Sequence, residues 1–163
     1  MENMLTSLLD SELQFELQSS GNMIKLEPLE LAYSNSTIDW DNNWIRTKIC
    51  ARGGVFSGEY IADIMTTDYE KFKQELNTLY DNLKGKAFFS DLEGALKLEI
   101  QGDGLGHFKV DVTVCDEPCF GAKLNFTMTF DQTYIKPMVR QMNEITKRDP
   151  IRGKEFKIRN IDL

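Results

Sequence analysis

The strongest constraint on the fold is a strict alternation of apolar and polar residues in the second half of the sequence. It occurs in three consecutive runs, at residues 96–100, 108–114 and 120–130. In a β-strand this pattern places the apolar side chains on one face and leaves the other face in water, as in antiparallel sheets. Short segments rich in Gly, Asp, Glu or Pro separate the runs. The sequence therefore predicts a three-stranded antiparallel meander over residues 95–130.

Strands are also expected in the first half, where the alternation is less regular. Residues 13–17 alternate. Residues 24–33 do so too but contain Pro28, which cannot donate to a ladder and indicates an edge strand or a bulge. Residues 43–51 and 55–62 flank a Gly-Gly pair, so they predict a hairpin.

One segment between these two groups of strands has helical spacing. Its apolar side chains recur at intervals of three and four residues, which predicts a helix over residues 68–84. Thr67 and Glu70 have the spacing of a capping box at its start. Gly85 is a suitable C-terminal stop, because glycine readily adopts the left-handed conformation that ends many helices.

A second helix is expected over about 134–147, provided that Pro137 lies in its first turn. The expected order is strands, helix, strands, helix, without a βαβ pattern, an internal sequence repeat or a low-complexity linker. This order predicts one α+β domain over residues 1–163, with segments 1–12 and 150–163 peripheral. Its main feature is antiparallel β-sheet, as a meander or sandwich-like, packed by one or two helices.

The acidity of the chain bears on its partners. The formal net charge is −7 at pH 7. An acidic body repels nucleic acid and anionic lipid and attracts basic partners at long range. Many proteins are acidic for solubility alone. The net charge by itself therefore does not decide between a basic partner and a role in solubility only.

The sequence favours the cytoplasm. Residues 1–15 contain no Lys or Arg, whereas a secretory signal begins with a basic region. No apolar stretch approaches the roughly 18 residues that span a bilayer, so no membrane partner is expected. The three cysteines are an odd number, which suits a reducing compartment better than a disulfide framework.

Few residues are suited to catalysis. His107 is the single histidine, which excludes a multi-histidine metal site, and no base partner for it is evident. The glycine-rich segment 102–106 links two expected strands, whereas a phosphate-binding loop leads from a strand into a helix. We therefore expect no enzymatic activity, no catalytic residues and no cofactor.

A zinc-binding or small-ligand module stays open as the alternative function. Its candidate ligands are Cys50, Cys115, Cys119 and His107. Structural zinc sites draw four ligands from two close clusters, and among these candidates only Cys115 and Cys119 form a close pair. The sequence therefore predicts no metal site.

Both tryptophans lie in residues 38–44, mixed with two aspartates and two asparagines. A tryptophan beside carboxylates suits a protein-binding surface, because the ring supplies area and the acids attract Arg or Lys. The alternative is that a tryptophan closes the core and the polar residues form a turn; we expect this of Trp44, and a partner contact of Trp40. A second acidic group is expected on the meander. The predicted partner contacts are Asp39, Trp40, Asp41, Asp111, Asp116 and Glu117.

The same segment carries a resemblance to a known family. The stretch Asp-Trp-Asp-Asn-Asn-Trp-Ile at residues 39–45 leads into a strand and the Gly-Gly turn. The sequence Gly-Glu-Tyr-Ile-Ala-Asp-Ile at residues 58–64, the helix and the meander follow. In this order the chain resembles the WapI-type bacterial immunity proteins and their uncharacterised relatives, from about residue 13 to residue 145.

The resemblance implies a cytoplasmic antitoxin without catalytic activity. Such proteins are similar to the partners of polymorphic wall-associated toxins, whose C-terminal domains are often nucleases that act on tRNA. An immunity protein binds its toxin domain and covers the active site or the substrate surface. We therefore expect a cognate basic toxin domain as partner. The acidic body fits this expectation, because an acidic inhibitor complements the basic surface that a nuclease presents to RNA.

Overall fold

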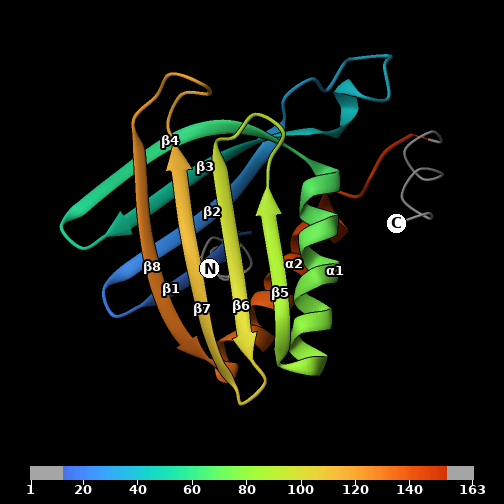
Figure 1. Ribbon diagram of the computed structural model, residues 1–163. Helices are drawn as coiled ribbons and strands as arrows, with labels where there is room; N and C mark the ends of the chain where they lie inside the picture. Colours follow the sequence, from blue (N-terminus) through green and yellow to red (C-terminus); the bar gives the residue numbers. More distant parts are fainter. Residues whose placement is uncertain (1–12, 154–163) are drawn as a thin grey trace, which may run out of the picture.

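The same order of elements, four strands followed by a helix, occurs twice along the chain (Figure 1). The computed structural model describes residues 13–153. The first unit comprises β1 (Phe15–Ser19), β2 (Asn22–Leu31), β3 (Trp44–Gly53), β4 (Phe56–Met65) and α1 (Thr66–Asn82). The second unit comprises β5 (Lys84–Ser90), β6 (Leu96–Asp103), β7 (His107–Cys115), β8 (Lys123–Asp131) and α2 (Ile135–Arg148).

Each unit forms one four-stranded antiparallel sheet, with the strands in chain order. The predicted α+β class with antiparallel sheet and two helices is therefore confirmed. The repetition of elements was not expected, because the two halves share no visible sequence repeat. No helix within residues 13–153 is long and apolar enough to span a bilayer. The predicted peripheral segments lie largely outside the described residues.

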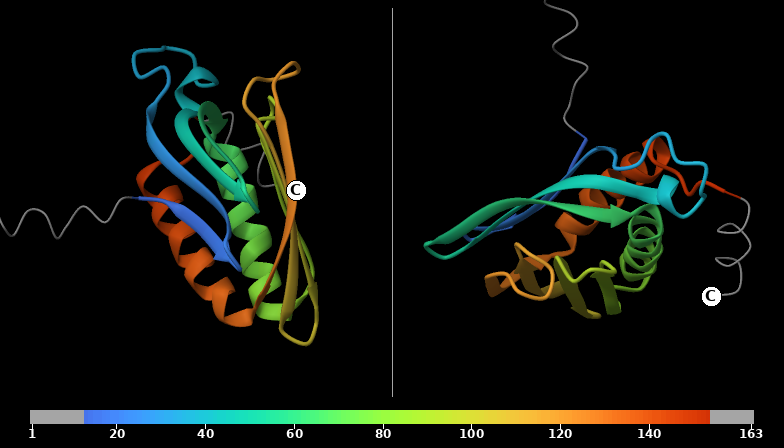
Figure 2. Two further views of the ribbon diagram at one scale, coloured as in Figure 1. Left: turned by 90° about the vertical axis from the view of Figure 1, so that its left-hand side faces the viewer. Right: turned by 90° about the horizontal axis from the view of Figure 1, so that it is seen from above.

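Helix α1 lies between the two sheets and joins their cores (Figure 2). The ring of Phe72 packs edge-on against Phe15 of β1 at 5.6 Å and against Phe89 of β5 at 5.4 Å between centroids. All three side chains are fully buried. Helix α2 packs beside α1 and β1. The apolar faces that the alternation predicts therefore form one continuous core with the helices.

The start of α1 differs from the prediction. The helix begins at Thr66, and the Asp68 carboxylate accepts a hydrogen bond from the Met65 backbone N–H at 3.3 Å. The predicted capping box of Thr67 and Glu70 is therefore wrong by two positions, since Met65 and Asp68 occupy these places. Asp68 is partly buried, and its desolvation raises the pKa of the carboxyl to about 6.

The end of α1 also differs, since Leu83 rather than Gly85 adopts the left-handed conformation, with φ of 56°. Strand β5 begins at the next residue, so Gly85 lies within it. The start of α2 agrees with the prediction, because Pro137 occupies its first turn, where a missing N–H leaves no helical bond unmade.

The predicted meander is confirmed as β6, β7 and β8, with two corrections. Residues 120–122 belong to a turn, and β8 begins at Lys123. Strand β5 adds a fourth strand that the sequence analysis did not anticipate, paired with β6. The predicted hairpin of β3 and β4 is also confirmed, with Gly54 and Val55 as its turn.

Pro28 lies at a bulge in β2, as one of the two predicted alternatives has it. The register between β2 and β3 shifts between Pro28 and Glu30. The pairing of β1 with β2 ends at Leu26, so the absent N–H of Pro28 removes no ladder hydrogen bond on that side. The carbonyl of Pro28 accepts from the Arg148 guanidinium at 2.8 Å, which fixes the end of α2 to this strand.

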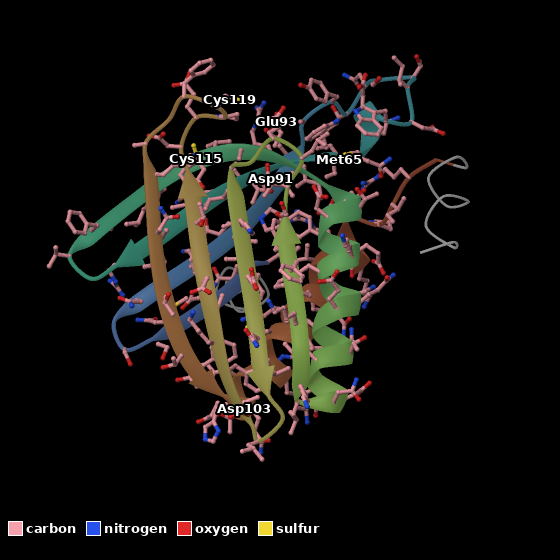
Figure 3. The ribbon with its side chains drawn as sticks, in the orientation of Figure 1. Met65, Asp91, Glu93, Asp103, Cys115 and Cys119 are labelled. Carbon is pink, nitrogen blue, oxygen red and sulfur yellow. The ribbon has the colours of Figure 1, made fainter. Side chains whose placement is uncertain are left out.

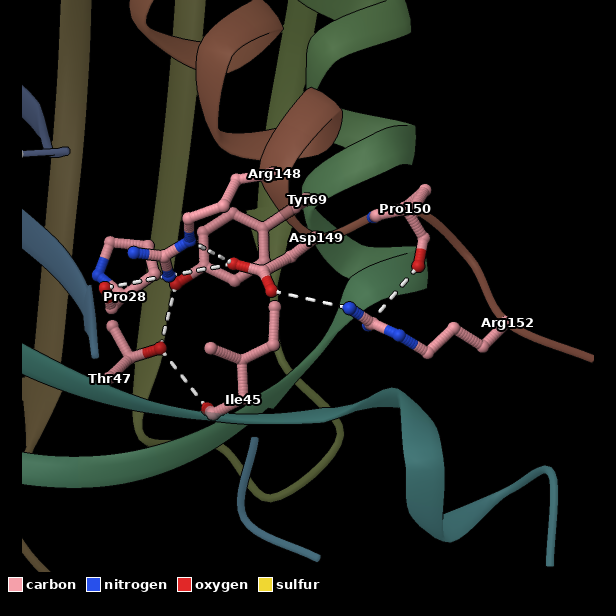
Figure 4. Close-up of polar contacts among 8 residues, drawn as sticks. All are labelled: Pro28, Ile45, Thr47, Tyr69, Arg148, Asp149, Pro150 and Arg152. Atoms are coloured by element: carbon pink, nitrogen blue, oxygen red, sulfur yellow. Dashed lines mark hydrogen bonds and ion pairs between the residues drawn. The ribbon is translucent and has the colours of Figure 1, made fainter. Parts of the chain in front are cut away.

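A buried polar pair connects β3 to α1 (Figure 4). The Thr47 hydroxyl donates to the Ile45 carbonyl at 3.2 Å and therefore accepts from the Tyr69 hydroxyl, which lies 2.8 Å away. Thr47 and Tyr69 are fully buried, and burial raises the pKa of Tyr69. Each hydroxyl is thus satisfied inside the core, as buried polar groups require.

An ion-pair cluster follows the end of α2 beside this pair (Figure 4). The Asp149 carboxylate is nearly buried and lies 2.7 Å from Arg148 and 3.5 Å from Arg152. Two cations thus compensate one carboxylate that has lost most of its hydration. The cluster holds the segment after α2 against the first sheet.

Candidate protein-binding site

Three connections between strands gather at one end of the molecule, at the top of Figure 1. They are residues 32–43 between β2 and β3, residues 91–95 between β5 and β6, and residues 116–122 between β7 and β8. The labels of Asp91 and Cys119 mark the second and third connections in Figure 3. The predicted contact residues lie in the first and third of these connections, except for Asp111, which lies on β7.

The first connection is fixed by Asn43, whose side chain is fully buried. Its amide nitrogen donates to the carbonyls of Asp39 at 2.8 Å and Arg152 at 2.7 Å. Its Oδ1 accepts from the Thr66 hydroxyl at 2.6 Å and from the Arg152 N–H at 2.8 Å. These bonds join the connection to the start of α1 and to the segment after α2. The sequence did not reveal this role, because the partner at position 152 is 109 residues away.

The predicted residues Asp39, Trp40 and Asp41 differ in exposure. Asp39 is exposed, whereas Asp41 is half-buried and accepts from the Ser36 hydroxyl at 2.9 Å. Trp40 exposes 43% of its surface and packs edge-on against Trp44, with 6.3 Å between centroids. Trp44 is buried, as predicted for a core residue. Asp39 and Trp40 are thus available at the surface, while Asp41 shapes the loop.

The second connection is organised by Asp91, which the sequence analysis missed. This buried carboxylate accepts from the backbone N–H groups of Leu96 at 2.7 Å, Ala95 at 3.1 Å and Glu93 at 3.0 Å. The resulting turn leaves the side chains of Leu92 and Glu93 exposed. An Asp followed three residues later by Gly is a turn signal that could have identified this connection from the sequence.

The third connection is a tight turn around two acidic residues. The Asp116 carboxylate accepts from the Ala122 N–H at 2.8 Å, and the Glu117 carbonyl accepts from the Gly121 N–H at 2.8 Å. A side chain at position 121 would collide with Asp116, so the turn requires glycine there. Phe120 leaves 88% of its surface exposed at the tip. An exposed phenylalanine on a hydrogen-bonded turn suits contact with another protein.

Two adjoining hollows, of about 430 Å³ and 280 Å³, follow β4 and have Asp116 in common. The larger lies between residues 61–63 and the second connection, and the smaller lies between residues 56–60 and the start of β8. We name the two hollows together the β4 groove. The Tyr60 hydroxyl crosses toward the second connection and donates to the Ala95 carbonyl at 2.5 Å. Burial raises the pKa of Tyr60, so this hydroxyl stays a donor at neutral pH.

Carboxylates outnumber cations in the walls of the β4 groove. The charged wall residues are Arg46, Glu59, Asp63, Glu93, Asp116 and Lys123. Arg46 Nε lies 3.6 Å from the Asp63 carboxylate, which it partly neutralises. Within residues 13–153, neither Glu93 nor Asp116 forms an ion pair with Lys or Arg. The groove therefore presents unbalanced negative charge beside apolar surface.

Asp111 lies apart from the other two predicted acids of the meander. It is in the middle of β7, on the outer face of the second sheet. Its carboxylate accepts from the Thr127 hydroxyl at 2.7 Å and from the Lys109 ammonium at 3.1 Å, and both bonds hold its pKa below the usual range. The structure thus brings Asp116 and Glu117 together in one turn but leaves Asp111 in a separate, locally paired position.

The residues proposed for the zinc alternative do not converge. His107 begins β7 and Cys115 ends it, which separates them by roughly 26 Å in an extended strand. Cys50 lies on β3 and donates to Glu59 at 3.4 Å, while Cys119 is exposed on the third connection. The described part of the chain contains no group of three or more His, Cys, Asp or Glu that could hold a metal ion. This placement gives the zinc alternative no support.

A further hollow of about 610 Å³ lies at the opposite end of β7 from the β4 groove. Phe108 and Phe130 stack in its wall, with 5.4 Å between centroids, next to Tyr134. His107 Nδ1 lies 3.0 Å from the Asp103 carboxylate at its rim. Its walls include neither Trp40 nor the acids of the three connections, so it is distinct from the candidate site.

Two solved structures resemble this fold at a distance. The first is the crystal structure of WHY1 from Arabidopsis thaliana, with a TM-score of 0.45, 12% sequence identity and coverage of 91% of this chain and 90% of that chain. The second is the MRP1/MRP2 structure from Trypanosoma brucei, with a TM-score of 0.45, 8% identity and coverage of 90% and 95%. A search of the curated proteins found no match.

The comparison with protein families is specific. The model of the WapI-like immunity protein family matches residues 14–150, which is most of the chain. This match spans both four-stranded units and all three connections that form the candidate site. It agrees with the resemblance that the segment around the two tryptophans indicates. The chain belongs to the immunity protein WapI-like family.

Proposed function

We propose that the protein binds a cognate toxin domain and neutralises it by covering the toxin's active site or substrate surface. It acts in the cytoplasm and catalyses no reaction. The toxin domain is basic, and we expect an RNase. The observation that carries this proposal is the β4 groove, where two carboxylates without an ion pair in residues 13–153 lie beside apolar surface in a member of an immunity protein family.

Charge supports a basic protein as the partner rather than nucleic acid. The net charge of −7 repels phosphate backbones at long range. A nuclease must present basic surface to its own substrate, so the same surface is attracted to Glu93 and Asp116. Complementary charge raises the association rate, which benefits an inhibitor that must capture its toxin before the toxin reaches its substrate.

The apolar residues at this end supply the rest of the binding surface. Phe120, Leu92 and Trp40 are exposed on the third, second and first connections, respectively. Aromatic and apolar side chains near the centre of an interface carry most of its binding energy, while charges at the rim mainly steer encounter. We therefore expect the toxin to cover the β4 groove and the tips of these connections together.

The test uses the toxin domain encoded beside the protein's own gene, made catalytically inactive and purified. Its affinity is measured by calorimetry at low and high salt. Glu93→Lys should weaken binding by about 10-fold at low salt, because it places a cation in an acidic groove that faces a basic partner. Trp40→Ala should weaken binding by about 2 kcal/mol if this ring is a principal contact.

Glu144→Lys is the matched control, since it makes the same charge change on the exposed face of α2. It should alter affinity far less than Glu93→Lys. Co-expression with the active toxin domain gives the functional readout, since the wild-type chain should restore growth. Absence of binding between the wild-type chain and this toxin domain would contradict the proposed function.

A further inference from the structure

The four edge strands of the two sheets differ in whether side chains from elsewhere in the chain bond their outward backbone groups. Edge strand β1 has its outward Glu16 N–H bonded to the Gln141 side chain of α2 at 3.1 Å. Edge strand β5 has its outward Phe88 N–H bonded to the Glu75 carboxylate of α1 at 2.5 Å. A helix side chain thus bonds one outward N–H on one edge of each sheet.

Edge strand β8 is covered in another way, by the turn between β1 and β2. The Thr129 carbonyl accepts from the Ser19 hydroxyl at 2.6 Å. The Thr127 carbonyl accepts from the Asn22 side chain at 3.4 Å. Side chains of the first unit thus bond two carbonyls on the edge of the second sheet. On three of the four edge strands, β1, β5 and β8, at least one outward backbone group has a side-chain partner.

Strand β4 is the fourth edge strand, and the backbone groups that point away from β3 have no partner along residues 57–63 within the described chain. The two-residue turn makes Gly53 and Phe56 the closing hydrogen-bonded pair of the β3–β4 hairpin. Pairs alternate along an antiparallel ladder, so every second residue of β4 turns its N–H and C=O away from β3. Within residues 13–153 these groups have no hydrogen-bond partner. The residues concerned are Ser57, Glu59, Ile61 and Asp63.

The surroundings of this edge restrict what can pair with it. The β4 groove runs along it, with Tyr60 and Leu124 in the smaller hollow, Glu93 in the larger hollow and Asp116 in both. Side chains of an added strand would alternate between the groove and solvent. Side chains that enter the smaller hollow would meet the apolar surface of Tyr60 and Leu124. Those that enter the larger hollow would meet the carboxylates of Glu93 and Asp116.

We infer that β4 binds an extended segment of the toxin domain as a fifth strand of the first sheet. This inference rests on the proposed function and specifies its partner chemistry. The segment has an apolar side chain and a Lys or Arg on the same face, directed into the β4 groove. Backbone hydrogen bonds to β4 supply affinity, and the groove supplies specificity, as in other cases of strand addition.

Charge disfavours a second copy of this chain as the occupant in the register centred on Ile61. In an antiparallel pairing of two β4 strands centred on Ile61, Glu59 of each copy would lie opposite Asp63 of the other. Like charges directly opposite one another across strands are destabilising. A basic segment meets no such repulsion.

The test compares two substitutions at one position of β4. Ile61→Pro removes an outward N–H without removing a hydrogen bond to β3, and proline is tolerated at such edge positions. Ile61→Ala removes the apolar side chain but keeps the N–H. With the purified, inactive toxin domain as probe, we expect Ile61→Pro to weaken binding about 30-fold or more and Ile61→Ala by less than about 5-fold. Circular dichroism and thermal unfolding establish that both variants are folded.

Hydrogen exchange of the wild-type complex provides a second measurement that needs no variant. The amides of Ser57, Glu59, Ile61 and Asp63 should exchange markedly more slowly once the toxin domain is bound. Wild-type binding without this protection, or with full affinity in a folded Ile61→Pro variant, would overturn the inference and leave the proposed function intact. A dimer of the free chain that Ile61→Pro dissociates would also overturn it, in favour of a second copy. Failure of the wild-type chain to bind would overturn both proposals.

Discussion

The two units share an order of elements but differ in what they expose. In the second unit, β5 is covered by α1 and β8 is covered by the β1–β2 turn. In the first unit, α2 bonds one outward N–H of β1, whereas five of residues 56–61 on β4 are exposed and the outward backbone groups of residues 57–63 have no partner within residues 13–153. Both edges of the second sheet therefore have outward backbone groups bonded by side chains, whereas residues 57–63 on the β4 edge of the first sheet have none within residues 13–153.

The two units also differ in their connections. The first unit has one long connection, residues 32–43, which is held by the buried side chain of Asn43. The second unit uses short turns in which a carboxylate, Asp91 or Asp116, accepts backbone N–H groups. Both solutions hold exposed apolar side chains in place at the same end of the molecule. A duplicated order of elements can thus support different surface chemistry in each copy.

The largest effect is expected where the two units are joined. Phe72→Ala should lower the free energy of unfolding by about 3–5 kcal/mol, because this fully buried ring contacts both sheets. Chemical denaturation should still show one transition, since the units share a core. Tyr80→Ala, at a partly exposed position of the same helix, is the control and should have a much smaller effect. Two separate transitions in the wild-type chain would show that the units fold independently.

A glycine pair sharpens the contrast between the closed sheet and the open one. An alanine Cβ at Gly102 of β6 would collide with the Leu83 carbonyl and with the Phe108 ring, so Gly102→Ala should destabilise by about 2 kcal/mol. An alanine Cβ at Gly58 of β4 would meet no atom within 4 Å, so Gly58→Ala should change stability by less than about 0.5 kcal/mol. Thermal unfolding of the two variants measures the difference in stability. Equal destabilisation would contradict the inference that position 102 is crowded and position 58 is not.

Opening a covered edge is expected to have a smaller effect. Glu75→Ala removes the acceptor for the Phe88 N–H and should destabilise by about 1 kcal/mol. Glu75→Gln keeps an amide oxygen as acceptor and should recover part of this loss. Exchange of the Phe88 amide, followed by nuclear magnetic resonance, should accelerate in the alanine variant. Unchanged exchange there would mean that the carboxylate does not protect this edge.

The smallest effect concerns pH and the junction of β4 with α1. The pKa of Asp68 is raised to about 6 by desolvation, so the folded chain binds more protons than the unfolded chain between pH 4 and pH 6. The contribution of Asp68 to the free energy of unfolding therefore falls as pH rises from 4 to 6 and changes little above pH 6. Asp68→Asn should flatten the dependence by up to about 1 kcal/mol once solvent screening is considered. Denaturation midpoints at pH 4.5 and 6.5 measure the difference, and identical slopes in both proteins would exclude this contribution.

The sequence predicts the strands best where one face is buried and the other is wet. Strands β6, β7 and β8 have that environment, and their alternation identifies them. Strand β5 escaped prediction because it follows α1 without a loop and its one short alternating stretch begins at Ala87. The boundary between the helix and this strand is marked by Leu83 in the left-handed conformation, which a leucine does not signal.

The candidate site could be predicted only in part. Surface exposure of Trp40, Asp116 and Glu117 agrees with local sequence, because turn residues and isolated aromatic residues tend to lie outside. The groove itself could not be predicted, since it requires β4 of the first unit to lie beside connections that follow it by 26 or more residues in the sequence. The contacts of Asp39, Trp40, Asp41, Asp111, Asp116 and Glu117 with a partner stay predictions.

The bonds from Ser19 and Asn22 to the carbonyls of β8 have a consequence for stoichiometry. A sheet that offers two free edges can propagate into a filament, because each added strand creates a new edge beyond it. Within residues 13–153, side chains bond outward backbone groups on β1, β5 and β8, whereas residues 57–63 of β4 have no such bond, so we expect strand addition to begin at β4. If β4 is the edge that binds, we expect one molecule of this protein to accept one strand and its complexes to end at a single partner.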